Sequence, residues 1–364
     1  MKMKRVYAWL LALCMVFSMA LTSVSAEEAT EAPTEETGTQ LVIEELEGVE
    51  NGLSFVREDA FSQENAAPDI SPEEDVRVII VMEGDCVVSA DSGAVYNDQT
   101  AAQLNAIESD QDQVIAEIEE QALEGQSLEV SYRFGWLVNG VAATIPYGKM
   151  DEVAAVEGVS KVVLQTVYEP CTTQDPGTLT PKTNSDGAMI GREEAWARGY
   201  TGKGMTIAVI DTGLDTDHQN FQALPQEALN SNSMDESDPA EVLPSLHAYE
   251  RYEGLTAEDV YYSTKVPFGF NYVDDSLDIT HDNDTQGDHG THVAGIATAN
   301  AVGDSGVVGV APDAQLLVMK VFGQGGGAYT EDWLAALEDA LMLQCDVVNM
   351  SLGSPAGFTT SSDF

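Results

Sequence analysis

Residues 288–295 read Asp-His-Gly-Thr-His-Val-Ala-Gly, and this stretch decides how the second half of the chain folds. After His289 the chain continues with Gly, Ala, Ile and Thr, spaced so that one side stays small and apolar. That pattern is typical of a helix packed tightly inside a domain. We therefore expect a helix that begins at His289, with the imidazole at its amino end.

An upstream segment, residues 205–217 (MTIAVIDTGLDTD), is the partner of this helix. Its apolar start is rich in Ile and Val and stops at Asp211, which predicts a buried strand with a carboxylate at its carboxyl end. Open parallel sheets carry their sites at that edge. An Asp at a strand end and a His at a helix start suggest two members of a Ser-His-Asp triad. Either motif alone also fits a plainer role, in which Asp211 caps a turn and His289 is a packed polar residue.

Two later blocks follow in a fixed order, residues 309–312 (GVAP) leading to Lys320-Val321, and residues 349–353 (NMSLG). Together with AVIDTGLDTDH and HGTHVAG, these blocks make the chain similar to the subtilisin-like serine peptidases, the subtilase family. The resemblance implies an α/β fold, part of a doubly wound parallel-sheet catalytic domain of the subtilisin type. It also implies a serine-type endopeptidase acting on protein or peptide substrates, with Asp211 and His289 as catalytic residues and no cofactor required for catalysis.

A second, narrower resemblance concerns residues 265–272 (KVPFGFNY). An acidic segment follows them and leads to His289. These residues resemble the lactocepin-type cell-envelope proteinases, which are large, multidomain and often attached to the wall. The resemblance implies cell-envelope attachment through regions beyond residue 364. Just upstream, residues 221–264 are acidic and lack clean periodicity, so we expect an inserted surface segment there.

Composition narrows the classes of partner. The chain has 62 acidic and 15 basic residues and a net charge of -47, which argues against a phosphate-binding surface and against nucleic acid as a partner. Such an acidic balance is commoner as a solubility device than as a binding device. With 364 residues the chain is long enough for about two domains of roughly 150 residues each.

The first 75 residues predict export followed by a spacer. Residues 1–26 combine a basic start, an apolar run and a small-residue end (Val24-Ser25-Ala26), as in a secretory signal peptide. We therefore expect a secreted protein, extracellular or in the cell envelope. Residues 27–75 are crowded with Glu, Thr, Ala and Pro and predict an acidic, largely disordered spacer.

Residues 76–170 predict a small α+β domain. The expected elements are a strand at 76–82, one long or two broken helices at 100–124, two strand-like runs around Asn139-Gly140, a helix at 150–157 and a strand at 159–168. This order is that of a ferredoxin-like split βαβ unit. Directly before a subtilisin-like domain, such a unit resembles the family's inhibitory propeptide. The resemblance implies that it assists folding and acts as an intramolecular inhibitor, blocking the cleft through the tail after Tyr168.

Residues 171–189 hold mostly Pro, Thr and Gly and predict a linker with a processing site, although the sequence does not name the bond. Residues 190–364 then form the incomplete amino-terminal part of the peptidase domain. Within it, Thr330 is expected to cap a helix with an apolar stripe. The stripe consists of Trp333, Leu337, Ala340 and Leu341.

Two short segments resemble the family's substrate-binding edges. The first is a glycine-rich lip, Gly326, Gly327 and Ala328, where missing side chains permit close approach of a peptide backbone. The second is Ser351, Leu352 and Gly353. The resemblance implies that the lip pairs with an extended substrate as an added strand. A plain Gly-rich loop is the alternative reading of the lip.

The serine nucleophile is absent from the sequence. Residues 354–364 contain no Gly-Thr-Ser segment of the kind the family uses, and no Gly-X-Ser-X-Gly occurs. We therefore expect the chain to be an inactive fragment of a longer protein whose serine lies beyond residue 364. The alternative is a non-catalytic truncated protein whose propeptide-like domain acts as a peptidase inhibitor or folding chaperone. The odd, widely spaced cysteines after the signal, Cys86, Cys171 and Cys345, do not make a disulfide framework.

Metal sites have weak support in the sequence. His292 follows His289 by three residues, but no Glu adjoins it in the metallopeptidase pattern, so we expect a buried, hydrogen-bonded histidine there. Structural calcium is implied only by resemblance, because many relatives hold it near the corresponding positions. Here those positions are Asn220, Asn300 and Asp304, and Asn220 departs from the usual Asp.

Overall fold

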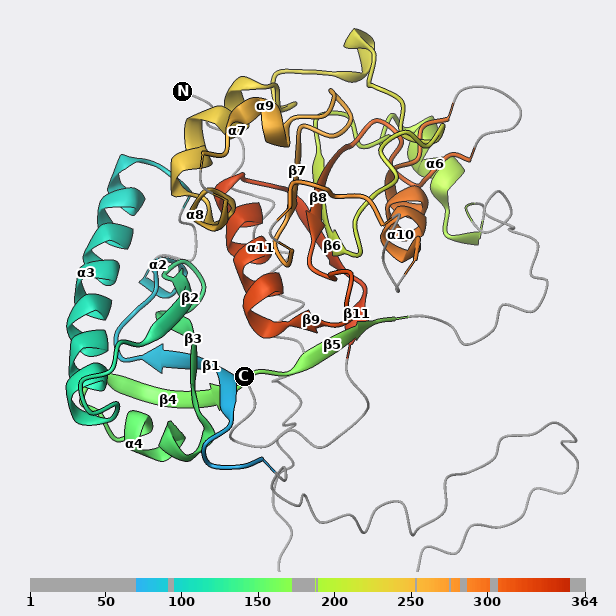
Figure 1. Ribbon diagram of the computed structural model, residues 1–364. Helices are drawn as coiled ribbons and strands as arrows, with labels where there is room; N and C mark the ends of the chain where they lie inside the picture. Colours follow the sequence, from blue (N-terminus) through green and yellow to red (C-terminus); the bar gives the residue numbers. More distant parts are fainter. Residues whose placement is uncertain are drawn as a thin grey trace, which may run out of the picture. The chain divides into compact units, whose positions relative to one another are not determined.

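The computed structural model is shown in Figure 1. It describes residues 70–90, 95–171, 187, 189–252, 254–274, 276–281, 287–301 and 307–353. The predicted signal peptide, together with nearly all of the predicted spacer and linker, lies outside these ranges. All elements named below belong to one unit that runs from Pro72 onwards. Among the helices in the described ranges, none is both long and apolar enough to span a bilayer.

The first sheet is antiparallel and consists of four strands in the order β2-β3-β1-β4. Its strands are β1 (Asp75–Met82), β2 (Glu129–Phe134), β3 (Gly140–Pro146) and β4 (Val159–Leu164). Strand β1 pairs on both sides, so Ile79 faces Ala142 on one neighbour and Val163 on the other. Val78, Ile79 and Ile80 are fully buried, and the order of strands is that of a ferredoxin-like sheet, as predicted.

One long helix, α3 (Asp98–Gln121), accompanies this sheet, which settles the choice between one helix and two. Asn97 caps its start, and the Thr100 side chain closes a capping box. The shorter helices are α2 (Val87–Ala90), η2 (Tyr147–Lys149) and α4 (Met150–Ala154). The predicted hairpin is partly wrong, because β2 ends at Phe134 and residues 135–139 form a loop with Trp136 buried in it.

The predicted strand at 159–168 is wrong in its second half. The chain forms β4 and then a separate strand, β5 (Val167–Pro170), which leaves the first sheet. Strand β5 lies in the middle of a three-stranded antiparallel sheet in the order β11-β5-β9. Its partners are β9 (Ala328–Tyr329) and β11 (Leu352–Gly353). Pairing with distant residues therefore overrides the continuous strand-like run in the sequence.

The second large sheet is parallel, in the order β10-β6-β8-β7. Its strands are β6 (Thr206–Asp211), β7 (Phe268–Asn271), β8 (Gln315–Lys320) and β10 (Val347–Met350). Alternate residues of β6 enter different cores. Ile210 packs with residues of α11 (Thr330–Met342), whereas Val209 packs with Ala294 of α10 (His289–Thr298). Helices thus cover both faces of the sheet (Figure 1), and the predicted doubly wound fold is confirmed.

Residues 221–264 are not simply a surface insertion. They form short helices, namely η3 (Gln226–Ala228), α7 (Ser237–Val242), η4 (Leu243–Ser245), α8 (His247–Arg251) and α9 (Ala257–Val260). Leu246, Ala248 and Val260 are fully buried in the main core. The prediction failed because helices this short show no repeating apolar pattern. A further short helix, α6 (Arg192–Ala197), precedes the parallel sheet.

Candidate active site

The Asp211 carboxylate and the His289 imidazole meet at the carboxyl edge of the parallel sheet. Asp211 ends β6 and is 1% exposed, and its Oδ1 lies 2.7 Å from His289 Nδ1. The Thr212 N–H donates to the same oxygen at 2.7 Å. Burial raises the pKa of Asp211, and the hydrogen bonds from His289 and Thr212 oppose that shift. With Nδ1 donating to Asp211, a neutral ring carries its lone pair on Nε2.

The residues beside the pair explain how two distant segments come this close. The Gly290 N–H donates to Thr212 Oγ1 at 2.8 Å, which ties the start of α10 to the end of β6. A Cβ atom at Gly290 would lie 2.4 Å from the Gly213 carbonyl oxygen and 3.1 Å from Asp211 Oδ1. Any larger residue after His289 would therefore push the imidazole away from the carboxylate.

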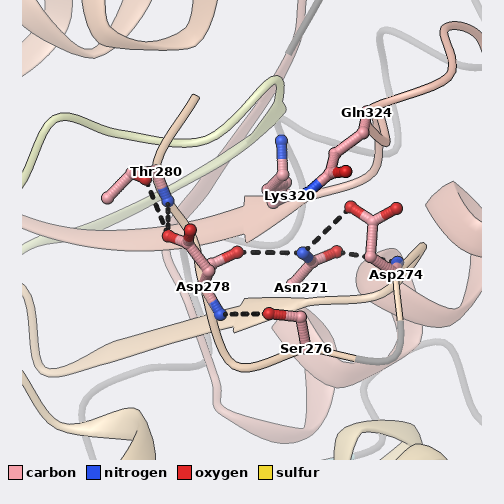
Figure 2. Close-up of a pocket in the computed structure, with 7 residues that line it drawn as sticks. All are labelled: Asn271, Asp274, Ser276, Asp278, Thr280, Lys320 and Gln324. Carbon is pink, nitrogen blue, oxygen red and sulfur yellow. Dashed lines mark hydrogen bonds between the residues drawn. The ribbon is translucent and has the colours of Figure 1, made fainter. Parts of the chain in front are cut away.

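A small polar pocket lies beside this region, and Figure 2 shows its lining. The Asn271 side-chain amide donates to the backbone oxygen of Asp278 at 2.9 Å. The Thr280 hydroxyl and N–H both bond the Asp278 carboxylate and lower its pKa. Nearby, Lys320 Nζ donates to the Thr212 carbonyl oxygen at 2.9 Å. These contacts hold the turn after β7 in place and support the chain that follows Asp211.

Residues 167–171 form a tail that lies next to the Asp211–His289 pair and is paired on both sides. On one side of β5, Tyr168 pairs with Ala328, and on the other Pro170 pairs with Leu352. The next residue, Cys171, donates its N–H to the Ser351 carbonyl oxygen at 2.9 Å. The carbonyl oxygen of Cys171 lies 3.2 Å from His289 Nε2. The imidazole therefore has a carboxylate on one nitrogen and a peptide carbonyl near the other.

The structure places five of the six predicted edge residues against this tail. Ala328, Ser351, Leu352 and Gly353 contact the tail through β9, β11 and the Ser351 carbonyl. Gly327 has a φ of +64°, and a Cβ atom there would lie 2.3 Å from Val167 Cγ1. Gly326 precedes it, also with positive φ. The lip thus lies against an extended segment of the same chain, as an edge that accepts an added strand does.

Sequence reasoning missed a buried charged site on α11. There α11 meets the first sheet and the segments that connect its strands, residues 75–165, which we call the first sheet unit. The Glu338 carboxylate accepts the backbone N–H groups of Trp136 at 3.0 Å and Leu137 at 2.7 Å. The Glu338 carboxylate also lies 2.9 Å from His247 Nε2. The neighbouring Asp339 carboxylate accepts the backbone N–H of His247 at 2.8 Å. Burial of the His247 ring alone would lower its pKa, but Glu250 and Glu338 outweigh burial and raise the pKa to about 10.

Two more carboxyl groups of α11 belong to the same contact region. Glu331 accepts from Arg77 at 2.9 Å and from Gln165 at 3.1 Å, both in the first sheet unit. Burial, reinforced by Glu331, raises the pKa of Asp332 to about 8. A signal was present in the sequence, because the paired acidic residues 331–332 and 338–339 are seven positions apart and share one helix face. The predicted stripe is partly wrong, since Trp333, Leu337 and Leu341 are less buried than these acids.

The resemblance implies calcium near Asn220, Asn300 and Asp304. The side chains of Asn220 and Asn300 make hydrogen bonds within the chain. Asn220 Oδ1 accepts the Val307 N–H at 3.3 Å. The Asn300 side-chain amide accepts from and donates to the Gln222 backbone. Asp304 lies outside the described residues. Among the residues that the structure describes, no group of three or more His, Cys, Asp or Glu side chains is placed to hold a metal ion.

Two further expectations concern His292 and the cysteines. His292 is exposed on α10, so the prediction of a buried histidine is wrong. Cys86, Cys171 and Cys345 are all free, and burial raises the pKa of Cys345 to about 12. Cys345 is therefore a packed thiol.

A parallel-sheet α/β domain with an Asp–His pair at its carboxyl edge is the class that the fold and the site define. Comparison with known proteins gives the family. Residues 202–363 match the model of the subtilase family. Residues 202–363 therefore belong to the subtilase family.

Individual relatives agree with this result. The chain is 31% identical over 306 residues to the PII-type proteinase of Lacticaseibacillus paracasei and to the PI-type proteinase of Lactococcus lactis subsp. cremoris. In both cases the match covers 80% of this chain and 14% of the relative. The minor extracellular protease Vpr of Bacillus subtilis is 29% identical over 237 residues, which is 62% of this chain and 24% of that protein. The chain thus spans only a small part of the length of these relatives.

Proposed function

We propose that this chain is the amino-terminal part of a secreted, subtilisin-like serine endopeptidase precursor. Asp211 and His289 are the acid and the base of its Asp-His-Ser triad, and the serine lies beyond residue 364. The observation that carries the proposal is the pair of contacts made by one ring. His289 Nδ1 lies 2.7 Å from Asp211 Oδ1, and Nε2 lies 3.2 Å from a peptide carbonyl oxygen.

These contacts suit peptide-bond hydrolysis. His289 takes the proton of the serine hydroxyl as that oxygen attacks a peptide carbonyl carbon, and then gives the proton to the leaving amine. Asp211 holds the ring in the tautomer that leaves Nε2 free for this transfer and stabilises the imidazolium that forms. All proton transfers run between protein groups and substrate, so the reaction needs no cofactor.

The first sheet unit and its tail are the intramolecular inhibitor of this site and an aid to its folding. Support comes from the tail, residues 167–171, which is paired on both sides and places a carbonyl beside His289. A protein substrate would occupy the same place as an added strand between β9 and β11. Export through residues 1–26 fits the likeness to an extracellular protease. Attachment to the cell envelope would depend on sequence outside residues 1–364.

The proposal is tested on the full-length protein. We expect His289→Ala to abolish casein cleavage and self-processing, with a loss of about 10⁶-fold in kcat, as for a missing triad base. The matched control is His292→Ala, which removes an exposed imidazole from the same helix and should keep activity. Activity that survives in His289→Ala would contradict the assignment.

A non-catalytic protein is the second candidate, because a tail paired between two strands also suits a peptidase inhibitor or folding helper. The nucleotide sequence after codon 364 separates the two. A continuing reading frame with a Gly-Thr-Ser segment favours the endopeptidase, and a stop codon at that position favours the inhibitor.

A further inference from the structure

We infer that the precursor is processed at the peptide bond on the carboxyl side of Cys171. This inference rests on the proposed function, because it takes Asp211 and His289 as the catalytic pair. It assigns a position to the cut that the linker sequence leaves open over 19 residues, 171–189.

The first argument is the position of the Cys171 carbonyl. Its oxygen lies 3.2 Å from His289 Nε2, within reach of the group that would act as general base. The N–H of the same residue donates to the Ser351 carbonyl oxygen at 2.9 Å. Cys171 is therefore held at its amide nitrogen while its carbonyl faces the imidazole. Cleavage needs an attacked carbon that stays in one place near the catalytic base, and the bond to Ser351 holds the Cys171 carbonyl carbon there.

The second argument is that the register of the tail is fixed on both sides. Tyr168 pairs with Ala328 of β9, while Glu169 pairs with Gly353 of β11. Sliding the tail by one residue would turn every side chain to the opposite face of this small sheet. Sliding by two residues would keep the faces but move the carbonyl by about 6.6 Å, out of reach of His289.

The third argument is a side-chain anchor that selects one register. The rings of Tyr168 and Trp333 meet edge to face, with centroids 5.9 Å apart and planes at 88°. Such pairs stabilise a contact beyond simple burial. Tyr168 lies three residues before Cys171, so the anchor and the imidazole mark two fixed points along one extended segment.

Cleavage follows as a balanced hydrolysis. The serine oxygen bonds to the Cys171 carbonyl carbon, and the bond from that carbon to the nitrogen of residue 172 breaks. The hydroxyl proton passes through His289 to the departing amine. Water then attacks the acyl ester, which frees the serine and leaves a carboxylate on Cys171. The released amino-terminal fragment therefore ends at Cys171.

Mass spectrometry of the fragment released by the purified full-length precursor tests the inference. The expected mass corresponds to a carboxyl terminus at Cys171, measured at the earliest time point. The fragment is measured rather than the mature enzyme because later trimming of the enzyme's new amino terminus does not change it.

Two variants test the arguments separately. Cys171→Pro removes the N–H that bonds the Ser351 carbonyl and should slow this cut by about 10- to 100-fold. Tyr168→Ala removes the ring from Trp333 and should slow it by about tenfold. The control is Glu120→Gln on the exposed side of α3, which should process at the wild-type rate.

The outcomes distinguish this inference from the proposed function. A fragment that ends at another residue, from a protein that cleaves casein, overturns the inference and leaves the proposed function standing. A wild-type protein that neither cleaves casein nor releases a fragment overturns both. Unchanged processing rates in both Cys171→Pro and Tyr168→Ala would also contradict the inference.

Discussion

Two histidine–carboxylate pairs with a buried carboxylate lie in the part of the chain that the structure describes, and they differ in what surrounds the second ring nitrogen. In the Asp211–His289 pair the atoms lie 2.7 Å apart, and in the Glu338–His247 pair 2.9 Å apart. His289 Nε2 lies beside the Cys171 carbonyl, on a tail that comes from far away in the sequence. His247 instead has carboxylates near both nitrogens, since Glu250 lies 3.7 Å from Nδ1.

This difference separates a pair that can move a proton from a pair that holds a charge. Glu338 has its oxygens occupied by two backbone N–H groups as well as by His247, so nothing is left for a substrate. Asp211 Oδ2, by contrast, has no hydrogen-bond partner among the described residues. Under the proposed function, one of these similar pairs serves the chemistry, and the other attaches the first sheet unit to α11.

The largest expected effect is on the first pair. Asp211→Asn keeps the size of the side chain but can donate to Nδ1, which stabilises the wrong tautomer of His289. We expect kcat on casein to fall about 10⁴-fold in the full-length enzyme. The thermal midpoint should change little in comparison. An activity within tenfold of wild type would remove the distinction between the two pairs.

The next effect concerns the second pair and appears in stability. Glu338→Ala leaves the His247 ring and the Trp136 and Leu137 N–H groups buried without their acceptor. Removing one partner of a buried ion pair costs about 3–5 kcal/mol. Urea unfolding of the precursor should show this loss, whereas Glu241→Gln, at an exposed position, should not. Equal midpoints for both variants would mean that Glu338 contributes nothing to the attachment.

The pH dependence of the free energy of unfolding gives a further test of the His247–Glu338 pair. The pKa of His247 is raised from 6.5 to about 10, so the stability it contributes is complete below pH 6.5 and is lost as the pH rises through about 10. Each unit of that shift corresponds to about 1.4 kcal/mol at most. We expect the free energy of unfolding to fall over this window, and to fall less steeply in His247→Gln.

The readout is the difference between variant and wild type, because the pKa of Asp332, raised to about 8, makes stability fall over part of the same pH range. His292→Gln, at an exposed imidazole, is the control. If His247→Gln and wild type lose stability in parallel from neutral to alkaline pH, then the His247 cation does not hold this contact.

The smallest effect is expected at the lip. Gly327→Val places a side chain where Val167 Cγ1 now lies and requires a φ of +64°, so the tail should dock less well. We expect processing to slow by about tenfold, from one strained residue and one lost contact. Gly325→Ala is the matched control, since a Cβ there meets nothing within 4 Å. Equal rates for both would leave the lip without a role in tail binding.

Motifs with local spacing were predictable from the sequence. The apolar run that stops at Asp211 and the small residues after His289 fixed a strand end and a helix start, and the parallel sheet brought them to one edge. The ferredoxin-like order of the first sheet followed from alternating and helical periods in the same way.

Features that depend on long-range pairing were not predictable. Strand β5 reads as a continuation of β4, and only its partners β9 and β11 pull it away. His247 lies in a segment without periodicity, and its burial is set by Glu338, 91 positions further along the chain. The burial of the acids of α11 was not predicted, because charged residues are rarely buried without partners. Those partners lie on the first sheet unit.

Labelling with a fluorophosphonate tests the central claim most directly, because this reagent bonds only to an activated serine. We predict that the full-length protein is labelled on a single serine downstream of Gly353, and that His289→Ala abolishes labelling while His292→Ala keeps it. Labelling that persists in His289→Ala would contradict the claim that the Asp211–His289 pair activates the nucleophile.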